Sequence, residues 1–107
     1  MKLLTEQIKK ILPPLYSTED IPCEDKKIIC RFFNPLGNQS WKIVEGSQEG
    51  DDWMLFGLVD IGFGDPEWGY ISLNELEALD VGLGLGIERD MLFGAFELHF
   101  GADELEA

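Results

Sequence analysis

The sequence predicts one α+β domain, residues 1–107, with an antiparallel meander sheet of four or five strands, an N-terminal helix and a second short helix packed on the sheet. Three observations predict this fold class. Four apolar or alternating stretches follow one another with short loops between them, as in an antiparallel meander. Two further stretches have apolar residues at helical spacing. A hydrophobic content of 45% is enough for one packed core in a chain of 107 residues.

The first helix is predicted over residues 3–12, where Leu4, Ile8, Ile11 and Leu12 have helical spacing and two lysines lie on the other side. The double proline that follows ends it, because proline disfavours helical geometry in the residue before it. The polar stretch "YSTEDIPCED" then reads as a loop.

The predicted strands are "KKIICRFF", "SWKIVE", "WMLFGLVD" and "WGYIS". In the first of them Cys30 and Phe32 share one face, and in the second Trp41 and Ile43 do. The third is apolar on both faces, which is typical of an inner strand. The segments between them, "NPLGN", "GSQEGDD" and "IGFGDPE", have the composition of turns and loops.

The second helix is predicted at "SLNELEALD", where Ser72 and Glu75 form a capping box and Leu73, Leu76 and Leu79 face inward. "VGLGLG" connects it to residues 87–100, for which a final strand is favoured over a helix. Residues 101–107 are expected to be a frayed acidic tail.

The charge of the chain is unevenly distributed. Acids outnumber bases by 21 to 8, so the net charge is −13. Residues 1–42 have a net charge of +2, whereas residues 43–107 hold sixteen acids and a single base, Arg89. Such a field repels nucleic acid and anionic membranes and attracts basic proteins. Its magnitude exceeds the roughly 2–8 charges that solubility needs in a small domain.

The two cysteines, Cys23 and Cys30, are too few for a disulfide scaffold and fit a reducing cytoplasm. The N-terminus "MKLLTEQIKKILPP" is expected to be neither a signal peptide nor a membrane span, because polar residues interrupt its apolar runs. We therefore expect a cytoplasmic protein.

Catalytic and metal sites find little support in the spacing of the acids. Most acids fall in predicted loops, whereas a glycosidase-like pair needs two rigidly held carboxylates in a cleft. In "DIGFGDPEWGYI" the third, fifth and twelfth positions are Gly62, Gly64 and Ile71, so the calcium-loop pattern fails. His99 is the sole histidine and cannot form a zinc site alone. We expect no cofactor and no metal.

Several blocks of the sequence resemble a family of small bacterial proteins of unknown function that are carried on plasmids and integrative conjugative elements. The blocks are "MKLLT", "LPPLYSTEDIP", "FFNP", W-x-I-V-E-G, DW-x-x-FG-x-VD, E-x-GY-x-SL-x-ELE and "GLGIERD", and they cover nearly the whole chain. The resemblance implies a bacterial cytoplasm and a mobile-element setting, and it brings no catalytic residues.

These observations favour a non-enzymatic acidic protein that binds a basic, nucleic-acid-binding protein. By analogy with inhibitors carried on mobile elements, it would block a restriction or CRISPR system by nucleic-acid mimicry. Two alternatives stay open: a small metal-dependent hydrolase using Asp60, Asp65 and Glu67, and a plasmid-maintenance protein that binds, or dimerises, through its sheet face. The residues expected to contact the partner are Glu49, Asp51, Asp52, Asp60, Asp65, Glu67, Glu75, Glu77, Asp80, Glu88 and Asp90, with Trp53 and Trp68 as apolar anchors.

Overall fold

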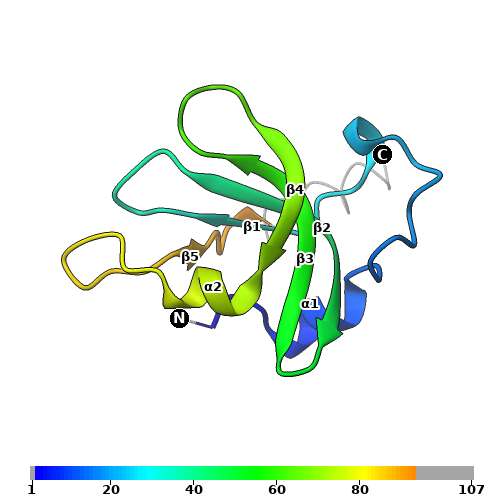
Figure 1. Ribbon diagram of the computed structural model, residues 1–107, viewed down its shortest axis with the longest axis horizontal. Coiled ribbons are helices and arrows are strands. Elements are labelled where there is room, and N and C mark those ends of the chain that lie inside the picture. The colour runs from blue at the N-terminus through cyan, green and yellow to red at the C-terminus, as the bar shows by residue number, and fades with distance from the viewer. Residues whose placement is uncertain (1, 94–107) are drawn as a thin grey trace, which may run out of the picture.

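The computed structural model describes residues 2–93 of the chain. A five-stranded antiparallel sheet in the order β4-β3-β2-β1-β5 forms its centre (Figure 1). The predicted α+β class, the meander and both helices are confirmed. The elements are α1 (Glu6–Ile11), η1 (Cys23–Asp25, a 3₁₀ turn), β1 (Cys30–Phe33), β2 (Ser40–Glu49), β3 (Asp52–Asp60), β4 (Glu67–Ser72), α2 (Leu73–Ala78) and β5 (Glu88–Arg89).

The connections gather at two opposite ends of the sheet. The β1–β2 loop (residues 34–39) and the β3–β4 loop (residues 61–66) lie at one end, because β1 to β4 form a meander. Residues 79–87 reach the same end, since β5 starts there beside Phe33. We call these three loops the loop end; they spread over the left of Figure 1. The β2–β3 turn lies at the other end, and we call residues 49–52 the hairpin tip.

The core lies between one face of the sheet and the two helices. Cys30, Phe32, Ile43 and Leu55 point from the strands into this layer, and all four are buried. From the helical side the core is filled by Leu3, Leu4, Leu12, Leu73 and Leu76. The other face of the sheet is partly covered by residues 15–26, in the long segment between α1 and β1 at the right of Figure 1.

The first helix is shorter than predicted. It begins at Glu6 rather than residue 3, because the Thr5 side chain accepts a hydrogen bond from the Ile8 N–H and caps it. Leu3 and Leu4 are buried ahead of the helix, where the chain bends. Ile11, predicted to face inward, is 64% exposed. The helical spacing therefore predicted that a helix forms here but not its first residue, which the Thr5 cap determines.

The segment "GSQEGDD", predicted as a loop, is mostly strand. β2 runs on to Glu49, β3 starts at Asp52, and only Gly50 and Asp51 turn the chain. Gly50 has φ +64°, a conformation in which glycine is unstrained. A β-bulge lies between Ile43 and Glu45, where the register with β3 shifts by one residue. The bulge turns Glu45 away from the core face that Ile43 occupies.

At the C-terminal side the structure confirms less of the prediction. Leu73 and Leu76 of α2 are buried as predicted, whereas Leu79 follows the helix and is largely exposed. Of the strand predicted within residues 87–100, only Glu88–Arg89 is found, paired with β1. Residues 94–100, which include His99, and the tail predicted at 101–107 lie outside the described part of the chain.

Replacing Ser72 with alanine should lower the free energy of unfolding by ~1 kcal/mol, the usual cost of losing an N-cap. Ser72 Oγ accepts from the Glu75 N–H at 3.2 Å and donates to the Asp52 carboxylate at 2.6 Å. Urea denaturation followed by tryptophan fluorescence measures the change. Only half of the predicted capping box forms, because the Glu75 side chain makes no hydrogen bond with any described residue, so Glu75→Ala is the control. An equal loss in both variants would contradict the assignment.

Candidate protein-binding surface

The predicted acids fall into three groups on the structure. Glu49, Asp51 and Asp52 form the hairpin tip, and Glu75 and Glu77 lie on α2, which starts beside that tip. The acids of the loop end are Asp60, Asp65, Glu67, Asp80 and Glu88. Asp90 follows β5 and lies apart from these groups, in an ion pair with Arg31.

The hairpin tip and the loop end do not meet on the sheet. Asp52 and Asp60 are the first and last residues of β3. Eight residue steps separate them, which is about 26 Å at the rise of a β-strand. The hairpin tip and the loop end therefore lie at opposite rims of the sheet. The predicted acids outside these two groups are Glu75 and Glu77 on α2 and Asp90 after β5.

Several of the predicted acids hold the fold together. Asp52 accepts hydrogen bonds from the Ser72 hydroxyl and from the N–H groups of Asn74 and Trp53. These hydrogen bonds lower the pKa of Asp52, and the bond from the Ser72 hydroxyl has the largest effect. Asp60 and Asp80 accept from the N–H groups two residues on, and Glu77 accepts from the Leu3 N–H at 2.9 Å. These carboxylates are already partly engaged by the protein.

Six predicted acids remain uncommitted among the described residues, since their side chains make no hydrogen bond or ion pair with any of them. No lysine or arginine occurs in residues 43–88, which hold eleven acids. Residues 43–87 therefore present carboxylates with no base among them, and Glu88 is followed by Arg89. The six are Glu49, Asp51, Asp65, Glu67, Glu75 and Glu88.

The two tryptophans predicted as anchors are both half-buried and make contacts inside the fold. The Trp53 ring packs against the core, and the Lys9 ammonium lies 5.7 Å from its centroid. Trp68 stacks on Phe56, with 5.7 Å between the ring centroids. Tyr70 also contacts Phe56, at 5.0 Å, and Tyr16 at 6.2 Å. The aromatic cluster of the second sheet face is therefore Phe56, Trp68, Tyr70 and Tyr16.

Sequence reasoning missed the most exposed apolar residues, which lie at the loop end. Phe63 is 85% exposed and Leu83 is 90% exposed. The signal was present in "GFG" and "GLG": a large apolar side chain between two glycines in a turn has no strand or helix to carry it into the core. In the sequence pattern, Phe63 and Leu83 belong to a predicted turn and a predicted connection, which give no indication of a binding role.

A buried ion pair on the second face of the sheet was also missed. Glu45 is only 4% exposed, and Lys26 Nζ lies 3.7 Å from its carboxylate. The N–H of Tyr16 donates to Glu45 at 2.9 Å and that of Thr18 at 3.2 Å, and the Thr18 hydroxyl donates as well. Burial alone would raise the pKa of Glu45, but these hydrogen bonds and the Lys26 charge together lower it.

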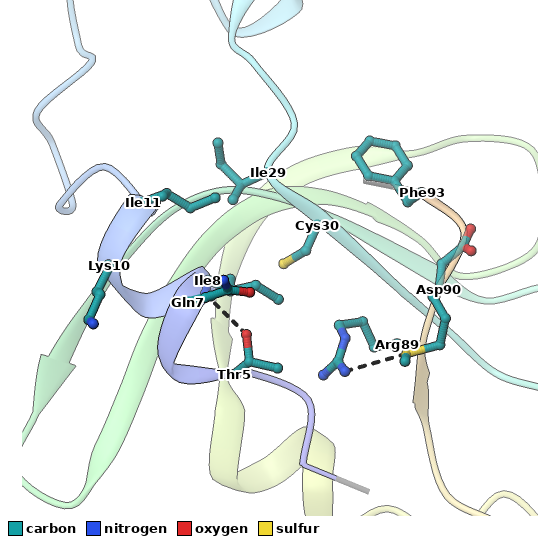
Figure 2. A pocket seen from close by; sticks show the side chains of 11 residues that line it. Thr5, Gln7, Ile8, Lys10, Ile11, Ile29, Cys30, Arg89, Asp90 and Phe93 are labelled. Atoms are coloured by element: carbon teal, nitrogen blue, oxygen red, sulfur yellow. Dashed lines mark hydrogen bonds between the residues drawn. The ribbon is translucent and has the colours of Figure 1, made fainter. Parts of the chain in front are cut away.

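Figure 2 shows a pocket of about 580 Å³ between α1 and the segment that carries Arg89, Asp90 and Phe93. Its walls are mainly apolar. Burial raises the pKa of the Cys30 thiol to about 12, although Arg89 opposes the rise, so the thiol is protonated at neutral pH. Arg89 donates to the Lys2 and Leu3 carbonyls at 2.8 and 2.9 Å. Arg89 thus joins β5 to the N-terminal segment, whereas Asp90 pairs with Arg31 of β1.

Metal-binding geometry is not found in residues 2–93: no three histidine, cysteine, aspartate or glutamate side chains come together there as a metal site would require. This includes Asp60, Asp65 and Glu67. Within the same residues no helix has both the length and the apolar character to cross a membrane.

A family model described as "Protein of unknown function (DUF2958)" matches residues 3–100, which is most of the chain. No curated protein and no solved structure matches the sequence. The match covers every block on which the family resemblance rested, apart from the first two residues of "MKLLT".

Proposed function

We propose that this chain, which belongs to the DUF2958 family of proteins of unknown function, is a non-enzymatic acidic protein that binds a basic protein partner. The observation that carries the proposal is the charge of residues 43–88: eleven acids, no base, and six carboxylates that no described residue engages. Surface carboxylates without internal partners remain available to lysine and arginine side chains of another protein, and they raise its rate of association.

The finer part of the proposal concerns the partner. A basic groove that binds nucleic acid would suit these carboxylates, since a duplex carries one charge per ~1.7 Å of its axis. The mobile-element setting implied by the family resemblance makes a nuclease of a restriction or CRISPR system the partner we propose. The separation of hairpin tip and loop end means that such a partner would meet two acidic groups at opposite ends of β3, not one continuous row.

No specific observation in the structure favours the hydrolase hypothesis or the plasmid-maintenance hypothesis. Asp60, Asp65 and Glu67 of the hydrolase hypothesis are not gathered around a common point in the described residues. For the plasmid-maintenance hypothesis, the apolar face of the sheet is covered by α1 and α2, and residues 15–26 pack against the other face at Glu45 and Ser47.

Neutralising two uncommitted acids should weaken partner binding by roughly tenfold, since exposed ion pairs are each worth ~0.2–1 kcal/mol. The experiment captures basic proteins from a bacterial lysate at low salt, identifies them, and measures the affinity of the purified partner by calorimetry. The variants are Glu49→Gln with Asp51→Asn at the hairpin tip, and Asp65→Asn with Glu67→Gln at the loop end.

The matched control is Glu24→Gln with Asp25→Asn, two exposed acids in η1 that give the same change in net charge. A specific surface predicts that only the pairs at the hairpin tip or the loop end weaken binding, and that salt weakens the wild-type complex. Equal losses in all three variants would mean that only net charge matters. An affinity indifferent to salt would refute the proposal.

A further inference from the structure

The loop end presents large apolar side chains directly to water. Phe63 lies at the tip of the β3–β4 loop and Leu83 at the tip of residues 79–87, with Ile61 beside the former and Leu36 on the β1–β2 loop; each is at least half exposed. Monomeric soluble proteins rarely keep such residues together on one part of the surface without a use for them. Three separate loops contribute here, so a single poorly placed residue does not explain the exposure.

The loops that carry these side chains are held in fixed conformations. Asp60 accepts from the Gly62 N–H and Asp80 from the Gly82 N–H, both at 2.8 Å. Val81 and Leu85 close the second tip with a hydrogen bond of 2.8 Å from Val81 N–H to the Leu85 carbonyl. These bonds order the tips before any partner arrives, which lowers the entropic cost of binding.

The β1–β2 loop joins the other two loops into one surface. It lies between them in Figure 1. A Cβ on Gly62 would be 3.3 Å from the Asn38 side chain, and a Cβ on Gly82 would be 3.4 Å from the Leu36 side chain. Leu83 also has φ +57°, which is strained for a leucine. A strained backbone that keeps an apolar side chain in water is a feature found at binding sites.

We propose that the loop end docks on the basic face of a protein partner, with Phe63 and Leu83 as its apolar anchors. This inference rests on the proposed function and names the part of the acidic protein that makes the specific contact. Binding interfaces concentrate their energy in a few apolar anchors and surround them with polar groups. Here the polar groups are the carboxylates of Asp60, Asp65, Glu67, Asp80 and Glu88.

Charge selects this occupant over others. A second copy of the chain would place the same carboxylates against one another, and like charges across an interface are repelled. An anionic lipid surface would be repelled for the same reason. A basic protein surface with apolar side chains among its lysines and arginines matches both the anchors and the acids.

The test uses two synthetic helical peptides as probes, one with leucines placed among lysines on the same face and one with glutamine in place of every leucine. Binding to the ¹⁵N-labelled full chain is followed by NMR. We expect the leucine peptide to bind at least ~10 times more tightly, and we expect shifts centred on residues 36, 61–65 and 82–85. Phe63→Ala and Leu83→Asn should each weaken it by ~10-fold or more, as anchor residues do; asparagine keeps the positive φ of residue 83 accessible.

Ile11→Ala is the control, because Ile11 is similarly exposed but lies on α1, beside the pocket of Figure 2. If Ile11→Ala weakens binding and Phe63→Ala does not, the peptide occupies that pocket and the inference is wrong. If both peptides bind with equal affinity and salt weakens their binding, the proposed function stands and the inference alone fails. If neither peptide binds, both fail. A concentration-dependent dimer abolished by Phe63→Ala would assign the surface to a second copy instead.

Discussion

Gly57→Ala is expected to destabilise the protein by about 3 kcal/mol or more, the upper range for overpacking in a core. A Cβ at Gly57 would lie 2.2 Å from the Lys42 carbonyl oxygen and 3.0 Å from the Ile43 Cα. Both are backbone atoms of β2, next to the bulge, so no side-chain rotation can relieve the contact. Urea denaturation followed by circular dichroism measures the loss; a variant that does not fold at all agrees with the same prediction.

Gly69→Ala is a matched control for this prediction. Gly69 pairs directly with Gly57 across β3 and β4, and a Cβ there would meet nothing within 4 Å. Alanine also restricts the unfolded chain more than glycine does, so Gly69→Ala should be neutral or stabilise by up to ~1 kcal/mol. If Gly57→Ala were as stable as Gly69→Ala, the close approach of β2 over Gly57 would be wrong.

Glu45→Gln should cost about 3–5 kcal/mol, because it leaves the buried Lys26 ammonium without its charge partner. The side chains of Lys26 and Glu45 are only 7% and 5% exposed. Lys26→Met removes the opposite charge and keeps the length of the side chain. The double variant should recover part of the loss, because it leaves no unpaired charge, and a double-mutant cycle on urea denaturation measures the coupling.

The comparison pair is Arg31 and Asp90. Their charged groups lie 3.3 Å apart, and each side chain is about a third exposed. Arg31→Gln should cost no more than ~1 kcal/mol, since solvent screens such a pair. If Arg31→Gln lowered the free energy of unfolding as much as Glu45→Gln does, burial would not explain why the Lys26–Glu45 pair matters more for stability.

The stability that Glu45 provides should also depend on pH. Its folded-state pKa lies below its ordinary value of 4.5, so the unfolded chain takes up the proton first as pH falls. The contribution is complete above pH 4.5 and is lost as pH falls further through the folded-state pKa. The difference in stability between wild type and Glu45→Gln should therefore shrink below pH 4.5.

The sequence predicted elements well where one local signal controls the structure. The inner position of β3 followed from its apolar character on both faces, and the start of α2 from the Ser72 cap. The alternation at Trp41 and Ile43 correctly identified a buried face of β2. It did not predict the bulge after Ile43, because strict alternation continued past Ile43 places Glu45 on the same face as Ile43.

The candidate surface was predictable only in part, for a related reason. The acids of residues 43–88 could be counted, and their position at the ends of β3 follows from the strand prediction. Which carboxylates the fold engages depends on contacts distant in sequence, such as Asp52 with Ser72 and Glu45 with Lys26. The return of residues 79–87 to the loop end depends on β5 pairing with β1, a pairing that local patterns do not determine.

The position of β4 at the edge of the sheet has a consequence for solubility. β4 pairs with β3 on one side, and no described strand pairs with its other side. Within residues 2–93 this edge of six residues is unpaired, and an unpaired edge is a template on which another chain can add a strand and begin an aggregate. At neutral pH, a net charge of −13 keeps copies of the chain apart. Near the isoelectric point of about 4.2 that repulsion vanishes, so acidification leaves the edge of β4 open to self-association.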